Sequence, residues 1–393
     1  MGERKVIIDS NNKIYLDMIE SGYSPEYIKE MVIEEFNQFF VNKEILQRNA
    51  IEVLLPELIN LIKLKQYEKY YQEFIMCVDM YTRSMNIDRE ECFKAFANWS
   101  LDINKAINKY WIIYNLDRVM EGLTLEEYVE VTFKNIGKLI EGVIKPYLFN
   151  ILNNIYIIKG EKEKIDTFKK KDLGVFFEEI IQSNMLGKLF NIQLETIGGI
   201  KQIKLNQLRN IVAHENYEFE GNVIKCFIKK KNEVIDSFSI SIEQLKKCFS
   251  DVYYTLGAIK LAYTIFFIDN IDEIIKYNPD KLNIRVEQQI VNTFLGIQSQ
   301  GFKIIDFVED SMESKLILQD ILCNDEKQRM IHSSQFLFRL WEITKAKNNI
   351  IEYLDNTGNL KAIFQLDSDV CEHINNGELE LLSQAELMKI KII

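Results

Sequence analysis

The sequence predicts a mainly α-helical protein: a helical bundle with an inserted β-hairpin, a helical N-terminal region and a small α+β C-terminal domain. Only 4 prolines and 16 glycines occur in 393 residues, and these residues cost a helix about 3 and about 1 kcal/mol respectively. Apolar residues recur at helical spacing through most of the chain before Asn278. Strand-like alternation is confined to one hairpin and to the last part of the chain. A chain of this length suits two or three domains.

The first expected domain, residues 1–120, is helical throughout. Ser24, Pro25 and Glu26 are typical of a helix start, because they supply a capping hydroxyl, a proline at the first helical position and an acid near the positive end of the helix dipole. Helical spacing of apolar residues then continues through residues 27–40, 44–64, 67–85 and 88–97.

The second expected domain, residues 121–278, begins with a capping-box pattern. Thr124 and Glu127 stand three positions apart, as the two members of such a box do. They open a long helical stretch, 125–158, in which Pro146 should cause a kink or a break. A further helix is expected at residues 173–190.

The rest of this domain carries one hairpin between two helices. The pair Gly198-Gly199 marks a break, and a helix is expected to start just after it and to run to about His214. Ser241 and Gln244 form another capping box, which starts a long apolar helix to about Tyr277. The strands expected between these helices are residues 223–228 and 234–240, joined by a turn at 230–232.

The third expected domain, residues 279–393, is small and of the α+β class. Asn278-Pro279 gives the clearest boundary in the second half of the chain. Helices are expected at residues 286–295 and 334–345, and extended segments at 302–308, 314–318, 359–366 and 388–393.

Charge and composition limit the classes of function. The net charge is −11, so nucleic acid could bind only through a locally positive region. Between residues 161 and 231, Lys and Arg outnumber Asp and Glu by 13 to 10. No Walker, GxGxxG, calcium-loop or HxxxH pattern occurs, so neither a metal nor another cofactor is expected.

The compartment expected from the sequence is the cytoplasm. The 6 cysteines are scattered without a CxxC pair, which is typical of free thiols in a reducing compartment. The N-terminus is charged from residue 3 and has no apolar region typical of a signal peptide. The longest apolar run, residues 252–268, has Lys260 at its centre and is expected to form a buried core helix rather than to cross a membrane.

One segment, residues 203–214, carries the chemistry. On a helix, its apolar residues fall on one face and its polar residues on the other. Arg209 lies at the border between the two faces, from which its long side chain can reach round. The inward face consists of Leu205, Leu208, Ile211 and Val212, and the polar ridge of Asn206, Asn210 and His214, spaced four residues apart.

These polar groups suit the cleavage of a phosphodiester. The imidazole of His214 can take a proton from a ribose 2′-hydroxyl or give one to a leaving oxygen. The guanidinium of Arg209 can pair with phosphate oxygens as negative charge builds on them. Asn210 can orient either the imidazole or a phosphate oxygen.

The segment LRNIVAHENY resembles the motif of the HEPN family (higher eukaryote and prokaryote nucleotide-binding domain): an arginine, a polar residue such as asparagine, and a histidine after four to six residues. Arg209, Asn210 and His214 match that pattern, and the resemblance extends over residues 124–277. It implies a helical bundle that forms a homodimer, in which two Arg/His pairs face one another.

The resemblance also implies a function. Many HEPN proteins are metal-independent endoribonucleases that leave 2′,3′-cyclic phosphate ends and act in toxin–antitoxin, abortive-infection or other anti-phage systems. RNA would then be the substrate, and an antitoxin or a phage-derived trigger a further partner. Other members are catalytically silent and serve as scaffold, antitoxin or sensor subunits. One subset carries Arg-x4-His-x-Tyr; here Tyr217 stands three residues after His214, so the chain departs from that pattern.

Each residue of interest also has a purely structural interpretation. His214 can be a histidine that favours the negative end of a helix dipole, and Arg209 can pair with a nearby acid such as Glu215. Asn206 and Tyr217 are supporting candidates, although Tyr217 can equally pack at the helix end. Lys169, Lys170 and Lys171 could guide the RNA backbone, or could be solvated loop lysines.

Overall fold

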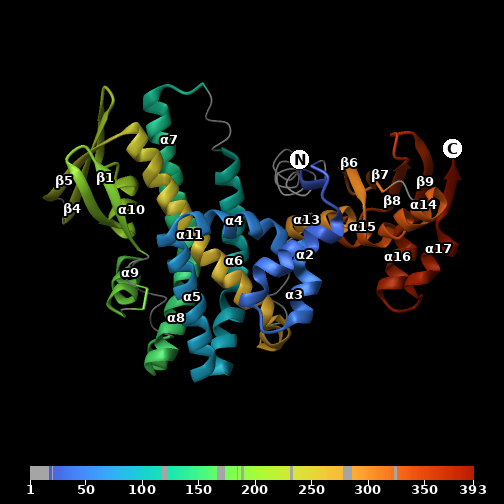
Figure 1. Cartoon of the computed structure of the whole chain (residues 1–393), viewed down its shortest axis with the longest axis horizontal. Coiled ribbons are helices and arrows are strands. Elements are labelled where there is room, and N and C mark those ends of the chain that lie inside the picture. Colours follow the sequence, from blue (N-terminus) through green and yellow to red (C-terminus); the bar gives the residue numbers. More distant parts are fainter. Residues whose placement is uncertain are drawn as a thin grey trace. The chain divides into compact units, whose positions relative to one another are not determined.

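The computed structural model describes residues 17–19, 21–116, 122–165, 173–183, 185–186, 190–230, 233–277, 286–322 and 325–393. The chain is mostly helical and also has several β-sheets (Figure 1). It divides into two compact units: unit 1 is Met1–Asn37, Leu46–Pro56 and Ile284–Ile393, and unit 2 is Gln38–Ile45 and Glu57–Asn283. This division differs from the three ranges expected from the sequence, because η2 (Ala50–Leu54) packs against α13 (Val286–Gln298) and groups with the C-terminal residues.

Four long helices surround the core of unit 2. They are α5 (Glu68–Ile87), α6 (Arg89–Leu116), α8 (Lys145–Lys159) and α11 (Ile242–Asp269), and α11 lies beside α5 in Figure 1. The apolar run expected to be a core helix is the buried part of α11, and its central Lys260 forms a buried ion pair with Glu57. The other helical elements of this unit include α4 (Leu55–Gln66), α9 (Leu173–Gln182), α12 (Ile271–Ile274), η5 (Lys162–Lys164) and η7 (Ile275–Tyr277).

The capping boxes expected from the sequence are confirmed. The Glu127 amide donates to Thr124 Oγ1 at 3.3 Å, and the Thr124 amide donates to Glu127 Oε2 at 2.8 Å. The same exchange between Ser241 and Gln244 starts α11. These bonds satisfy amide groups that have no partner within the helix, so α7 (Leu125–Lys138) and α11 begin where the pattern places them.

The break expected at Pro146 takes the form of a π-helical turn. This turn, η4 (Leu139–Ile144), joins α7 to α8, and the Lys145 amide bonds to the carbonyl of Ile140, five residues back. Proline has no amide hydrogen, so a helix that contains it must rearrange its hydrogen bonds nearby. The α-helical pattern resumes with Pro146 in the first turn of α8, where the missing donor costs little.

The structure corrects the expectation around Gly198-Gly199. Ile197 and Gly198 form the turn of a hairpin between β1 (Asn191–Thr196) and β2 (Gly199–Lys204), and Gly199, the first residue of β2, has φ +124°, a value that favours glycine. The next helix, α10 (Leu205–Ala213), therefore starts later than expected. The helix expected at residues 173–190 is also shorter, because α9 ends at Gln182.

The second hairpin is confirmed within a three-stranded antiparallel sheet. Strand β4 (Val223–Lys230) pairs with β5 (Glu233–Ser241) as expected, and also with β3 (Tyr217–Glu220), a strand that the sequence did not predict. Lys231 and Asn232 of the expected turn lie outside the described residues.

A five-stranded sheet forms the centre of unit 1. The strand order is β10-β9-β8-β7-β6, with β7 and β8 parallel and the other neighbours antiparallel. The extended segments expected from the sequence are confirmed as β6, β7, β9 and β10, and the expected helices as α13 and α15, whereas β8, α14, α16 and α17 are new. The bounds are β6 (Phe302–Glu309), β7 (Glu313–Asp320), β8 (Asn348–Leu354), β9 (Leu360–Asp367), β10 (Lys389–Ile392), α14 (Glu326–Ser334), α15 (Phe336–Thr344), α16 (Ser368–Asn375), η9 (Leu381–Ser383) and α17 (Gln384–Leu387).

The N-terminal segments also follow the sequence closely. Ser24 caps α2 (Pro25–Phe36) by accepting a hydrogen bond from the Tyr27 amide at 3.2 Å. The helix is followed by η1 (Asn37–Phe39), α3 (Lys43–Asn49) and the π-helical turn η2.

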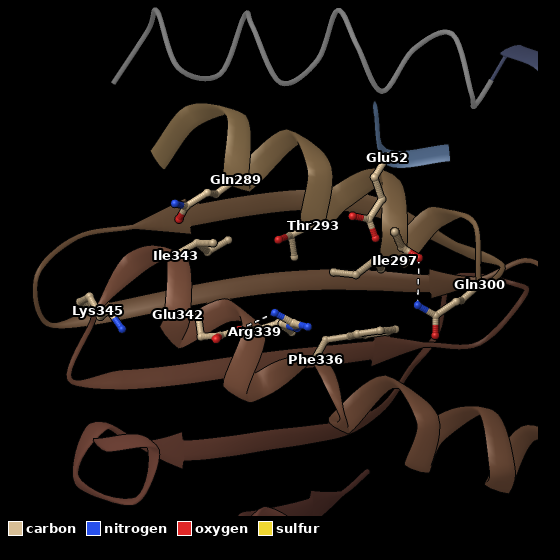
Figure 2. Close-up of a pocket in the computed structure, with 11 residues that line it drawn as sticks. Glu52, Gln289, Thr293, Ile297, Gln300, Phe336, Arg339, Glu342, Ile343 and Lys345 are labelled. Atoms are coloured by element: carbon tan, nitrogen blue, oxygen red, sulfur yellow. Dashed lines mark hydrogen bonds and ion pairs between the residues drawn. The ribbon is translucent and has the colours of Figure 1, made fainter. Parts of the chain in front are cut away.

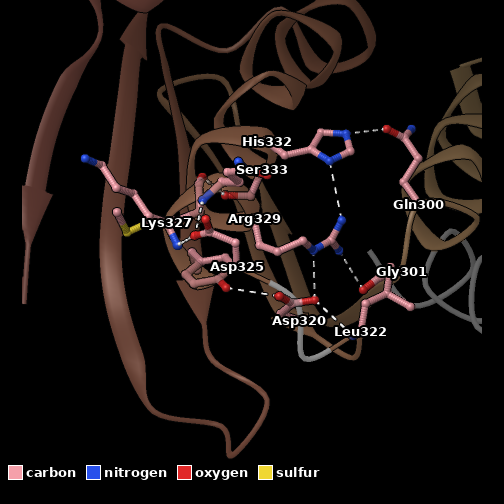
Figure 3. Close-up of polar contacts among 12 residues, drawn as sticks. Gln300, Gly301, Asp320, Leu322, Asp325, Lys327, Arg329, His332 and Ser333 are labelled. Atoms are coloured by element: carbon pink, nitrogen blue, oxygen red, sulfur yellow. Dashed lines mark hydrogen bonds and ion pairs between the residues drawn. The ribbon is translucent and has the colours of Figure 1, made fainter.

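A cavity of about 560 Å³ lies in unit 1 between α13 and α15, with Glu52 of η2 at its edge (Figure 2). Close to it, a buried ion pair joins the end of β7 to α14 (Figure 3). Arg329 Nε donates to Asp320 Oδ1 at 3.0 Å, and Arg329 Nη2 donates to the carbonyl of Gly301 at 2.9 Å. The Tyr353 hydroxyl donates to the second oxygen of Asp320 at 3.2 Å.

Three further findings concern the described part of the chain. None of its helices is both long and apolar enough to span a bilayer. No group of three or more His, Cys, Asp and Glu side chains in it is arranged to hold a metal ion. Five cysteines in it are free and buried, namely Cys77, Cys92, Cys226, Cys248 and Cys371, while Cys323 lies outside it.

Replacing Arg329 by methionine should destabilise the protein by about 3–5 kcal/mol, because Asp320 would keep a buried charge without its cation. The side chains of this pair are only 9% and 4% exposed. The matched control is Lys389→Met, since the side chains of the Lys389–Asp367 pair are 65% and 41% exposed. That substitution should cost less than about 1 kcal/mol. Urea unfolding measures both changes, and equal losses would contradict the importance assigned to the buried pair.

Candidate functional site

The helix that carries the motif, α10, is held tightly against α7. A Cβ atom added to Gly137 of α7 would lie 2.8 Å from Cγ1 of Val212, closer than two carbon atoms approach without strain. Glycine at this position therefore allows the two helices to come together. On the same helix Leu205, Leu208 and Ile211 are buried, which confirms the inward face expected from the sequence.

The chain turns sharply where α10 ends. His214 is the residue that caps the helix, with φ −112° and ψ 11°, and Glu215 follows with φ +49°. The Asn216 amide then bonds to the carbonyl of Ile211 at 2.8 Å, which closes the turn. His214 is thus the capping residue of α10, and its amide still donates a helical hydrogen bond to the carbonyl of Asn210 at 3.2 Å. Its imidazole is exposed and has no hydrogen bond or ion pair with any other described residue.

Arg209 is held by two neighbours. It forms an ion pair with Glu141, and its Nη1 donates to Oδ1 of Asn210 at 3.0 Å. The side chains of Arg209 and Glu141 are 31% and 32% exposed, so the pair lies at the surface but is partly shielded. The Nε atom of Arg209 is buried without a hydrogen-bond partner in the described chain. The structural interpretation that paired Arg209 with Glu215 is therefore wrong about the partner.

Glu141 is the site residue that the sequence did not reveal. It lies in the π-helical turn η4, and its Oε2 is also 3.6 Å from the Nζ of Lys145. Lys109 of α6 lies nearby, because a Cβ added to Gly142 would be 3.0 Å from its Cδ. Two basic side chains, Arg209 and Lys145, thus approach the carboxylate of Glu141, and Lys109 lies against the neighbouring Gly142. No spacing rule marks Glu141, since the residues before it fit an uninterrupted α-helix.

The supporting candidates are not all brought to this site. Asn206 faces α9: its Nδ2 is 3.5 Å from where a Cβ of Gly174 would lie, and its Oδ1 is buried without a partner. Tyr217 packs flat on Phe133, with ring centres 4.3 Å apart, and burial together with Glu130 raises its pKa, so its phenol stays neutral. Lys169, Lys170 and Lys171 lie outside the described residues.

Arg209, Asn210 and His214 lie in the last turn of α10 and at its cap. Arg209 and His214 are separated by five positions, which correspond to about 7.5 Å along a helix axis and about 140° around it. A single nucleotide would therefore contact both groups only where the long side chain of Arg209 reaches round the helix. A single copy of the chain offers one exposed imidazole here, whereas acid–base cleavage uses one group to accept a proton and another to donate one.

No family model, curated protein or solved structure matches the chain. Function must therefore be inferred from the residues and contacts of the site itself.

Replacing Gly137 by alanine should destabilise the protein by about 1–3 kcal/mol, because the added methyl group would push Val212 and α10 away from α7. Adding Val212→Ala should relieve the clash. The loss of stability in the double variant should therefore be smaller than the sum of the losses caused by the two single substitutions. A coupling of at least about 0.5 kcal/mol is expected in urea unfolding.

Gly198→Ala is the control for this double-mutant cycle. A Cβ at Gly198 would meet no other atom within 4 Å, so the substitution should change stability little. Additive effects of Gly137→Ala and Val212→Ala would show that the close approach of α7 and α10 does not fix the position of the motif helix.

Proposed function

We propose that this chain is a metal-independent endoribonuclease of the HEPN type, an effector in bacterial anti-phage defence or in a toxin system. One observation carries the proposal: the imidazole of His214, exposed and without a partner among the described residues, stands at the end of the helix that holds Arg209 on Glu141 beside Lys145. Basic groups around a general base suit a phosphodiester substrate.

The chemistry follows from these groups. An imidazole accepts the proton of a ribose 2′-hydroxyl, and the 2′-oxygen attacks the adjacent phosphorus. The bond between phosphorus and the 5′-oxygen breaks, and that oxygen takes a proton from a second imidazole. The products carry a 2′,3′-cyclic phosphate and a 5′-hydroxyl. Arg209 binds the non-bridging phosphate oxygens as their negative charge increases.

A second copy of the chain would supply the second imidazole. In the homodimer that the motif implies, the ends of two α10 helices face one another across a shared cleft, so one His214 accepts the proton and the other donates one. The exposed position of the imidazole supports this, because a second chain can approach it.

Glu141 has a positioning role in this mechanism. Arginine presents five N–H donors, and Glu141 and Asn210 occupy two sides of the guanidinium of Arg209. The side chain is therefore oriented before RNA arrives, which lowers the entropic cost of placing it. Phosphate must bind to the donors that remain, or displace one of these partners.

The same contacts favour a second candidate function. A guanidinium that is neutralised by a carboxylate, with its Nε buried, also suits a catalytically silent scaffold, antitoxin or sensor subunit that mediates dimerisation or ligand binding. If the chain is instead an enzyme that the Arg209–Glu141 pair restrains, an antitoxin or a phage-derived trigger would control its activity by altering that pair.

The purified wild-type chain should cut RNA in the presence of EDTA, and Arg209→Ala and His214→Ala should each lower the rate by at least about 10²-fold. The measurement is a time course on total and transfer RNA, with end-group analysis for 2′,3′-cyclic phosphate. His373→Ala is the matched control, because His373 is also an exposed histidine but is paired with Glu378 in unit 1.

Cleavage that survives His214→Ala, or that requires a divalent metal, would sink this mechanism. Glu141→Gln distinguishes two roles of the Arg209–Glu141 pair. If Glu141 positions Arg209 for catalysis, the variant should cleave RNA more slowly than the wild type. If Glu141 instead restrains Arg209, as in the silent or partner-controlled case, the variant should cleave RNA faster.

Co-expression of an excess of the His214→Ala chain should suppress the activity of a tagged wild-type chain. A mixed dimer would hold one imidazole where the reaction uses two, so the specific activity recovered through the tag should fall as the excess increases. Excess untagged wild-type chain is the control and should not lower it. Activity that is independent of the added variant would show that each chain acts alone.

A further inference from the structure

The cavity between α13 and α15 is a built site that the ribonuclease chemistry does not use. It has a volume of about 560 Å³, within the range of small-molecule pockets. All its lining residues belong to unit 1, and seven of the eleven are polar or charged. A lipid or another wholly apolar ligand would desolvate these groups without giving them partners, so the occupant must itself be polar.

The two walls of the cavity run antiparallel. The lining residues run from Gln289 on α13 to Gln300 just after it, and in the opposite direction from Phe336 on α15 to Lys345 just after it. Figure 2 accordingly shows Gln289 and Lys345 at one end, and Gln300 and Phe336 with Glu52 at the other. Eleven positions on a helix correspond to about 16 Å, so the cavity is elongated and its ends differ.

The α15 wall of the cavity carries two cations, Arg339 between Phe336 and Glu342, and Lys345 at the end of the helix (Figure 2). Arg339 is 68% exposed on its side chain and pairs with Glu342 at 2.8 Å. Lys345 follows α15 with φ +52°, a left-handed backbone at a helix end where glycine is the usual residue. Its Nζ lies 3.5 Å from the centre of the Trp341 ring. A lysine that is kept at a strained position, with its ammonium fixed over a ring, suits the binding of an anionic group.

The other end of the cavity combines an acid with apolar walls. A Cβ at Gly296 would lie 2.9 Å from Oε1 of Glu52, so the glycine makes the space into which this carboxyl fits. Partial desolvation raises the pKa of Glu52, although Arg339 opposes the shift. A carboxyl that holds its proton more tightly can both donate and accept hydrogen bonds. Phe336 and Ile297 line the cavity beside it, and they are themselves only 7% and 2% exposed.

Gln300, at this same end, is joined through His332 to the buried pair of Arg329 and Asp320 (Figure 3). Its Nε2 donates to the carbonyl of Gly296 at 2.9 Å, and its Oε1 lies 2.7 Å from Nε2 of His332. Nδ1 of His332 lies 3.4 Å from Nη1 of Arg329, which is a donor, so the proton of this imidazole belongs on Nε2. The wall is therefore preorganised through Arg329 and Asp320 before any ligand binds.

We propose that this cavity binds a nucleoside monophosphate. The phosphate pairs with Arg339 and Lys345, and the base lies against Phe336 and Ile297 with its polar edge toward Glu52. A free amino acid carries its two charges on neighbouring atoms and cannot reach both ends. A nucleic acid strand or a polyphosphate carries several negative charges along its length. Some of these charges would be repelled by the carboxylates of Glu52 and Glu342, which line the cavity together with the two cations.

Calorimetric titration of the full chain with the four ribonucleoside 5′-monophosphates tests the proposal. At least one should bind with a Kd below about 1 mM. Its nucleoside and inorganic phosphate should each bind at least about 10-fold more weakly, because each engages one end only. Arg339→Ala should weaken binding by a similar factor, and Glu52→Gln should change the preference among the four bases.

Two variants separate binding from folding. Lys345→Gly removes the cation at a position where glycine relieves backbone strain, so it should weaken binding without lowering the stability measured in urea. Lys389→Ala removes an exposed cation from β10, outside the cavity, and should leave binding unchanged. The His214→Ala chain should bind as the wild type does, which keeps this test independent of the proposed ribonuclease.

The proposal is overturned if none of the four monophosphates binds. It is also overturned if Arg339→Ala and Lys345→Gly bind as tightly as the wild type, or if inorganic phosphate binds as tightly as the best nucleotide. The last result would show an anion patch without a base site.

Discussion

The contact between Arg209 and Glu141 is the constraint on which the candidate site depends. It joins the motif helix α10 to the π-helical turn η4, and it works only because α7 carries glycine where Val212 approaches. The three features belong to different segments of the chain, and each limits the others. If α10 lay further from α7, the guanidinium would lose its carboxylate. If Glu141 turned away, Arg209 would be a partly buried cation with only the amide of Asn210 to hold it.

Different kinds of contact hold the buried side chains in place in the two units. Unit 2 relies on aromatic packing, such as the stack of Phe96 on Phe266 with ring centres 4.6 Å apart, and its functional groups lie at the edge of this core. Unit 1 places a polar network inside its sheet-and-helix layer, where Arg329 is shared by Asp320, His332 and the carbonyl of Gly301. A network of this kind fixes side-chain directions more strictly than apolar contacts do, because each donor must meet its acceptor. That strictness suits a wall that faces a ligand.

Local rules predicted much of the fold and part of the site. The capping boxes at Thr124 and Ser241 give correct helix starts because their hydrogen bonds lie within four residues. The same local reasoning failed at Gly198-Gly199, where a tight hairpin turn looks like a break before a helix. It could not find Glu141, because the partner of Arg209 is chosen by the packing of distant segments. The end of the motif helix was predicted within one residue, since α10 ends at Ala213 and His214 caps it.

The π-helical turn η4 has a consequence for how this region tolerates change. Such a turn is equivalent to one extra residue within a helix. Deleting a single residue between Gly137 and Pro146 would restore a regular α-helix, and the segments on either side would keep their facing, because the turn already compensates for the extra residue. Gly137 would still face Val212. Glu141, however, lies inside the turn, so its carboxylate would move relative to Arg209. A deletion here would therefore act on the ion pair without separating α7 from α10.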